Sequence, residues 1–115
     1  MRRIVITLML SAGFAAAALA HHGWGSYDAS KAITVEGAVQ TSKYENPHVL
    51  ITVKATDKVW TVVLAPTSRM MTRGALQAMV AVGKTVTAVG YASTAQTDEM
   101  RAERITVEGK TVELR

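Results

Sequence analysis

The chain has 115 residues with 13 basic and 9 acidic side chains, and a predicted cut after Ala20 leaves 95 residues with 11 basic and 9 acidic ones. That length suits one small domain, and the resulting net charge of +2 is too small to indicate a nucleic-acid partner. The sequence contains no cysteine, which excludes disulfides, thiolate metal sites and dithiol redox chemistry.

The first 20 residues have the composition of a secretory signal peptide. Arg2 and Arg3 form a positive start, residues 4–17 form an apolar segment, and Ala18 and Ala20 fit the A-x-A pattern of a cleavage site. We therefore predict a periplasmic or secreted protein. No later apolar run approaches the roughly 20 residues that a membrane-spanning helix needs, so we expect no membrane segment after cleavage. The predicted layout is a signal peptide at 1–20, an N-terminal arm at 21–31 and a single domain at 32–115.

Cleavage after Ala20 would place two histidines at the new N-terminus. His21 would then offer its free α-amino group and its imidazole to one metal ion, and His22 would add a second imidazole. Sites made of nitrogen ligands favour Cu(II) among the divalent ions, so copper is the first expectation, with zinc or nickel behind it. The alternative is that the His-His pair is a solvated tail that binds no metal.

Residues 23–31 are rich in glycine, serine and aspartate and are predicted to form an irregular arm with two aromatic side chains, Trp24 and Tyr27. We expect Trp24 to pin this arm to the surface of the domain, and we favour that role over stacking on a ligand. Pinning would determine where the terminal histidines point.

Alternating apolar and polar residues predict three consecutive antiparallel strands after the arm, over residues 32–44, 49–54 and 59–65. Gly37, inside the first of these strands, indicates a bulge or a sharp bend. Trp60 and Val62 share one face of the third strand.

The turn between the first two strands contains Asn46, Pro47 and His48. Pro47 restricts the backbone before His48, and Asn46 can form a hydrogen bond within the turn, so both would direct the imidazole. We interpret His48 as a third nitrogen ligand that completes the terminal site. The alternative is an ordinary loop histidine bonded to backbone, because the sequence does not show that the turn and the terminus meet.

Apolar spacing after Pro66 predicts a helix from Thr67 or Ser68 to about Val82, with Gly83 as its C-terminal cap. Its buried face would hold Met71, Ala75, Leu76, Met79 and Val80. Arg69, Arg73 and Gln77 would face away from the core. Thioether ligation of Cu(I) by Met70, Met71 and Met79 is a second interpretation, which we rank below a core role.

Further strands are predicted over residues 85–93 and 101–107, and a short last strand is predicted around Val112 and Leu114, after a turn at 108–110. A long bent strand, two more strands, one helix and then further strands is the order of the OB barrel. The predicted fold class is therefore mostly β: a small five- to six-stranded OB-like barrel with one helix between strands three and four.

Four short motifs occur in order along the predicted mature chain: His21-His22, Asn46-Pro47-His48, Trp60 and Glu108-Gly109. In this respect the chain resembles a family of small exported bacterial proteins of unknown function, which begin with His-His after the signal peptide and carry an Asn-Pro-His motif. The family often has serine where this chain has Gly23. The resemblance implies the OB-like fold and export, and it implies little about chemistry.

Two functional hypotheses follow. The first is a periplasmic copper-binding protein that uses the mature N-terminal histidine for carriage or sequestration, with the metal ion as its partner and a periplasmic protein as a further candidate partner. The second is an exported protein or glycan interaction module that binds no metal and uses the surface of Lys54, Lys58 and Trp60. We do not expect an enzyme, because neither a nucleophile motif nor paired carboxylates surround the serine, histidine and aspartate residues.

Overall fold

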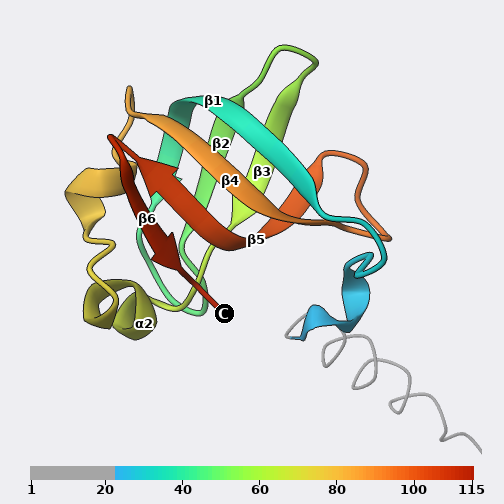
Figure 1. Ribbon diagram of the computed structural model, residues 1–115, viewed down its shortest axis with the longest axis horizontal. Coiled ribbons are helices and arrows are strands. Elements are labelled where there is room, and N and C mark those ends of the chain that lie inside the picture. The colour runs from blue at the N-terminus through green and yellow to red at the C-terminus, as the bar shows by residue number, and fades with distance from the viewer. Residues whose placement is uncertain (1–22) are drawn as a thin grey trace, which may run out of the picture.

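Strands that alternate buried and exposed side chains form the body of the computed structural model, which describes residues 23–115 (Figure 1). The six strands within that range are β1 (Ile33–Lys43), β2 (Leu50–Lys54), β3 (Val59–Val63), β4 (Thr85–Ala92), β5 (Glu99–Val107) and β6 (Lys110–Glu113). They form one sheet in the order β3-β2-β1-β4-β5-β6, and a parallel pairing of β3 with β5 closes five strands into a barrel. The predicted OB-like class is confirmed. The predicted signal peptide, His21 and His22 lie outside the described residues.

Closure depends on β1, which is long enough to pair with two different strands. Its first half, Ile33–Ala38, pairs with β4, and its second half, Ala38–Lys43, pairs with β2. Gly37 lies where these pairings meet, and a Cβ atom there would overlap the carbonyl oxygen of Lys54, so only glycine lets the two strands approach this closely. The break in register lies between Val39 and Thr41 rather than at Gly37.

Aliphatic side chains from every strand fill the barrel and replace disulfides as the source of stability. The largest fully buried side chains are Val39, Val49, Ile51, Val53, Val62, Leu64, Met70, Val80, Val86, Met100, Ile105 and Leu114.

The predicted long helix is wrong in its extent. One α-helix lies between β3 and β4, as predicted, but α2 covers only Thr67–Thr72, and a 3₁₀ turn, η2, follows at Gln77–Val80. Gly74 ends α2 with a positive φ of 89°, and its N–H group donates to the Met71 carbonyl. The hydroxyl group of Tyr44 donates to the Ala75 carbonyl at 2.6 Å, which helps to hold the chain out of the helix there.

The early end of α2 also changes which side chains are buried. Met70, Ala75 and Val80 are buried, whereas Met71 and Leu76, which we predicted to lie on the core face, are 53% and 56% exposed. A continuous helix would have kept Met71, Ala75 and Leu76 on one side. Within residues 23–115 no helix has the length and apolar character needed to cross a membrane.

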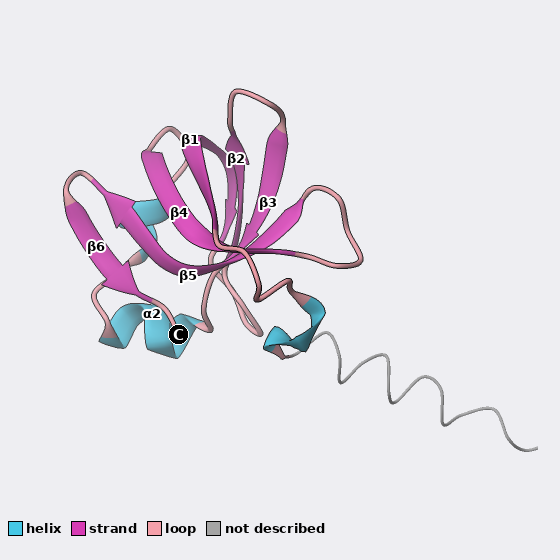
Figure 2. Cartoon of the chain, turned by 45° about the vertical axis from the view of Figure 1, so that its right-hand side comes forward, coloured by secondary structure: helices cyan, strands magenta, loops and turns pink. Residues whose placement is uncertain are grey.

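Two short segments flank the same end of the barrel. Figures 1 and 2 place α2 on one side of the C-terminal end and the 3₁₀ turn η1 (Trp24–Ser26) on the other. The hydrogen bonds of two arginines explain the position of α2: Arg69 donates to the Leu114 carbonyl at 3.2 Å, and Arg73 donates to the Glu113 carbonyl at 2.7 Å. The two arginines therefore join α2 to the end of β6 and do not simply face solvent.

Candidate functional site

Backbone hydrogen bonds fix the N-terminal arm to the barrel. The N–H group of Asp28 donates to the Ala92 carbonyl at 2.8 Å, at the end of β4. The N–H group of Thr94 donates to the Ser26 carbonyl at 2.9 Å. The arm therefore runs along the end of β4 and the loop that leads to β5, where Figure 2 shows η1 beneath the barrel.

Tyr27 anchors the arm with its side chain. It is buried, and its hydroxyl group donates to a carboxylate oxygen of Glu99 at 2.5 Å. Burial raises the pKa of Tyr27 strongly, and the adjacent Glu99 carboxylate raises it further. Tyr27 is therefore a neutral hydrogen-bond donor at physiological pH.

Trp24 packs on the barrel through four neighbouring side chains. The guanidinium carbons of Arg101 and Arg115 lie 4.2 and 4.4 Å from its ring centroid. The rings of Tyr27 and Tyr91 meet it edge to face, at centroid distances of 6.3 and 6.1 Å. These contacts confirm the prediction that Trp24 pins the arm to the domain.

Arg101 is buried on the outside of the barrel. Its neighbours in β5, Met100 and Ala102, belong to the core, so strand alternation directs Arg101 outward. It is nevertheless only 6% exposed, and the arm packs over it through Trp24. Burial lowers the pKa of Arg101, and the positive charges of Arg69 and Arg115 lower it further.

His48 contacts the same guanidinium group. A terminal nitrogen of Arg101 lies 3.4 Å from Nε2 of His48, and because a guanidinium group only donates, Nε2 accepts in this contact. Backbone hydrogen bonds join Val49 to Leu64 and Ala65, just after β3, and hold the chain next to His48. His48 and Trp24 therefore both contact the guanidinium group of Arg101, which lies between them.

Asn46 joins the predicted turn to α2 instead of bonding within the turn. Its side-chain oxygen accepts from the N–H group of Thr67 at 3.1 Å and from the Thr67 hydroxyl at 3.0 Å. The peptide bond between Asn46 and Pro47 is cis, and both residues are exposed. The turn that carries His48 is thus attached to the element that follows β3.

Only one of the three predicted metal ligands, His48, belongs to the described residues. Within residues 23–115 no group of three histidine, cysteine, aspartate or glutamate side chains is arranged to hold a metal ion. His21 and His22 precede this range, so the described residues place the arm and His48 together without testing the ligand set.

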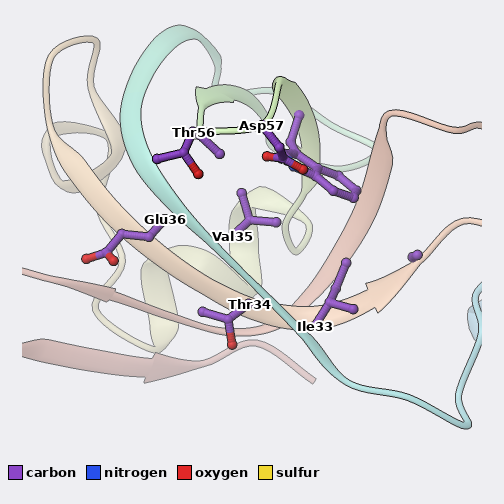
Figure 3. Close-up of a pocket in the computed structure, with 9 residues that line it drawn as sticks. Ile33, Thr34, Val35, Glu36, Thr56 and Asp57 are labelled. Carbon is purple, nitrogen blue, oxygen red and sulfur yellow. The ribbon is translucent and has the colours of Figure 1, made fainter.

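A second candidate site lies on the wall of the barrel, beside the hairpin that joins β2 and β3. This pocket has a volume of about 490 Å³, and Figure 3 shows the residues that line it. Trp60 lines it, donates from its indole nitrogen to Asp57 at 3.3 Å, and has the Lys58 ammonium 4.2 Å from its ring centroid. The other lining residues are Ile33, Thr34, Val35, Glu36, Ala55, Thr56 and Ala92. Of the predicted surface, Lys58 and Trp60 are therefore in contact, whereas Lys54 does not line this pocket.

Arg101 and Arg115 are two residues of this site that the sequence pattern did not predict. Arg101 occupies an outward position of β5, where arginine is ordinarily solvated, and nothing in the strand pattern indicates that it is covered. The one signal was indirect: an arm with two aromatic side chains needs a surface to pack on, and arginine is a common partner of tryptophan.

Comparisons with known proteins identify a family and a fold. A family model, DUF6152, described as a family of unknown function, matches residues 9–112. A search of curated proteins gave no match. Among solved structures, a complex of TiaS with an isoleucine tRNA and ATP is 16% identical with a TM-score of 0.53, over 77% of this chain and 20% of that one. A ZRD-deleted mutant of TiaS in complex with agmatine is 18% identical with a TM-score of 0.51, over 76% of this chain and 25% of that one. The chain spans a quarter or less of those proteins, and at this identity the likeness shows the fold alone.

Proposed function

The chain belongs to DUF6152, a family of unknown function, and we propose that it is an exported, periplasmic copper-binding protein for carriage or sequestration. The proposed ligands are the α-amino group and imidazole of His21 together with the imidazole of His48, and His22 is an alternative or additional ligand. The observation that supports this proposal most directly is that His48 and Trp24 contact the same Arg101 guanidinium group.

The first requirement of the proposal is that the new N-terminus lies within reach of His48. Three residues of chain span at most about 11 Å, and His21 precedes Trp24 by three residues. Trp24 packs on the barrel against Arg101, the residue that His48 also contacts, and this proximity supports the proposal.

The second requirement is a set of deprotonated nitrogen ligands that bind the metal ion strongly enough to overcome repulsion by nearby positive charges. Nε2 of His48 can accept from Arg101 only when the ring is neutral, and the neutral ring is also the form that binds metals. A metal ion would replace Arg101 as the partner of that nitrogen. Arg69, Arg101 and Arg115 oppose any divalent cation in this region, and the nitrogen ligands are what favour Cu(II) over zinc.

Calorimetry with Cu(II) tests the proposal on the chain that begins at His21. The same chain with its N-terminus acetylated lacks the chelating α-amine, and we expect its Cu(II) affinity to fall by at least about tenfold. His48→Gln should also lower the affinity, whereas Glu45→Gln, an exposed change in the same turn, should not. Equal affinities for the two chains would exclude the terminal amine as a ligand.

The pH dependence gives a second readout. Metal binding requires a deprotonated amine and neutral imidazoles, so the affinity of the chain that begins at His21 should fall as the pH drops toward and below about 6.5. A Cu(II) affinity that stays constant between about pH 7.5 and pH 5.5 would contradict histidine ligation.

A second candidate function is an exported glycan interaction module that binds no metal. The pocket lined by Trp60 supports it, because an indole ring that bonds the Asp57 carboxylate, with the Thr56 hydroxyl in the same hairpin, suits a sugar (Figure 3). Trp60 fluorescence in a Trp24→Phe variant, titrated with soluble oligosaccharides, tests this function. A saturable change that Asp57→Asn weakens would favour it over copper binding.

A further inference from the structure

Arg101 is a buried charge without a counter-ion among the described residues. It is the one charged residue in the range 23–115 that is buried, and its Nε atom is inaccessible and has no hydrogen-bond partner. None of the ion pairs within that range includes Arg101. A guanidinium group that is taken out of water normally has a carboxylate or another anion beside it, so this one lacks a partner that its burial calls for.

The surroundings of Arg101 increase this charge imbalance. Arg115 lies against the same Trp24 ring, and the charge of Arg69 also acts on Arg101. The carboxylate of Glu103 is already paired with Arg115 at 3.2 Å and with Arg104 at 3.4 Å. The carboxylate of Glu99 accepts from Tyr27. Within residues 23–115, both carboxylates therefore bond to residues other than Arg101.

We propose that Arg101, with Arg115 and Arg69 beside it, forms a binding site for a small oxyanion, and that Trp24 covers this site. An oxyanion presents at least two oxygen atoms to one guanidinium group, and it would supply the acceptor that Nε of Arg101 lacks. Carboxylate and phosphate groups share this chemistry. The positive charge of the three arginines favours either of them over a neutral ligand.

Trp24 has to shift for the anion to enter. The Nε atom of Arg101 is fully covered, and the ring of Trp24 lies over the guanidinium group. Trp24 is only half-buried and belongs to a short segment outside the barrel core, so it can move without opening the core. Its indole ring therefore reports on occupation of the site.

This oxyanion site does not depend on the proposed copper site. It involves residues that are all described, and it needs neither His21 nor a metal ion. An anion bound here would lie beside His48, but its binding can be measured in metal-free protein, so either proposal can fail while the other holds.

Titration of Trp24 fluorescence tests the oxyanion site. The protein is the chain that begins at His21, freed of metal on a chelating resin and carrying Trp60→Phe so that Trp24 is its one tryptophan. Inorganic phosphate and sodium acetate are added separately, with sodium chloride keeping the ionic strength constant. We expect a saturable change in emission with at least one of them, and the comparison shows whether the site prefers phosphate or carboxylate groups.

Substitution of Arg101 separates binding from general charge effects. Arg101→Met should lower the affinity for the anion about 10- to 100-fold. Lys54→Met, which removes one exposed positive charge, should leave this affinity unchanged. Phosphate at about ten times its Kd should raise the Tm of the parent protein by roughly 6 to 11 °C, and the same concentration should raise the Tm of Arg101→Met by no more than about 3 °C. Arg115→Met gives a second variant if Arg101→Met does not fold. The proposal is overturned if neither anion gives saturation, or if the arginine and lysine variants bind equally well.

Discussion

Replacing Trp24 with alanine separates the docking of the N-terminal arm from the stability of the barrel. The substitution removes two cation–π contacts, with Arg101 and Arg115, and two edge-to-face contacts, with Tyr27 and Tyr91. Trp24 is not part of the barrel core, so the barrel should still fold and unfold cooperatively. The arm would keep its backbone hydrogen bonds and the Tyr27 side chain as its remaining attachments.

The magnitude follows from the four lost contacts. A cation–π contact at a half-exposed site contributes about 0.5–1 kcal/mol, and an edge-to-face aromatic pair contributes about 0.5–1.5 kcal/mol. Together they stabilise the docked arm by about 2–5 kcal/mol, against the conformational entropy of ordering it. If copper binding needs the docked arm, losing even about 2 kcal/mol should raise the Kd for Cu(II) about 30-fold.

Two measurements check this prediction for Trp24→Ala. Hydrogen exchange should be faster at the amides of Asp28 and Thr94, whose hydrogen bonds join the arm to the barrel. Calorimetry should show the weaker Cu(II) binding. Trp60→Ala is the matched control, because it removes the other indole from the chain and leaves the arm intact. Unchanged protection of both amides would refute the docking argument. Loss of that protection without any change in Kd would refute the link between the arm and the metal.

Three further predictions concern the fold. Met70→Ala should lower the free energy of unfolding in urea by about 2–5 kcal/mol because Met70 is fully buried, whereas the same change at Met71, 53% exposed, should stay within about 0.5 kcal/mol. Gly90→Ala should destabilise by roughly 1–3 kcal/mol, because its Cβ would overlap the Arg101 carbonyl oxygen, while Gly25→Ala meets open space and should have little effect. The raised pKa of Tyr27 means that the native state keeps this proton at a higher pH than the unfolded chain, whose pKa is about 10. Its stabilising contribution is therefore complete below about pH 10 and is lost above it, so urea midpoints should fall less steeply above about pH 10 in Tyr27→Phe than in the parent protein.

Strands and turns were accessible from the sequence because their signals are local. Apolar side chains at every second residue predict a strand with one buried face, and this pattern located all the strands of the barrel. The predicted helix extended too far for a non-local reason. The spacing of Met71 and Ala75 fits a helix, but the chain leaves it at Gly74, where Tyr44 from another part of the barrel bonds the Ala75 carbonyl. A glycine within an otherwise helical pattern was the one local warning.

The sequence by itself determined the barrel class, the order of its elements and the histidines worth testing, because each depends on residue type and on spacing over a few positions. Only the tertiary structure decided that the arm covers Arg101 and that His48, 53 positions away in the chain, contacts the same guanidinium group. Strand alternation predicts that Arg101 points outward, and an outward arginine is normally hydrated. Its burial depends on where an irregular segment docks, which is set by the sum of many weak contacts with distant residues and by no repeating pattern in the sequence.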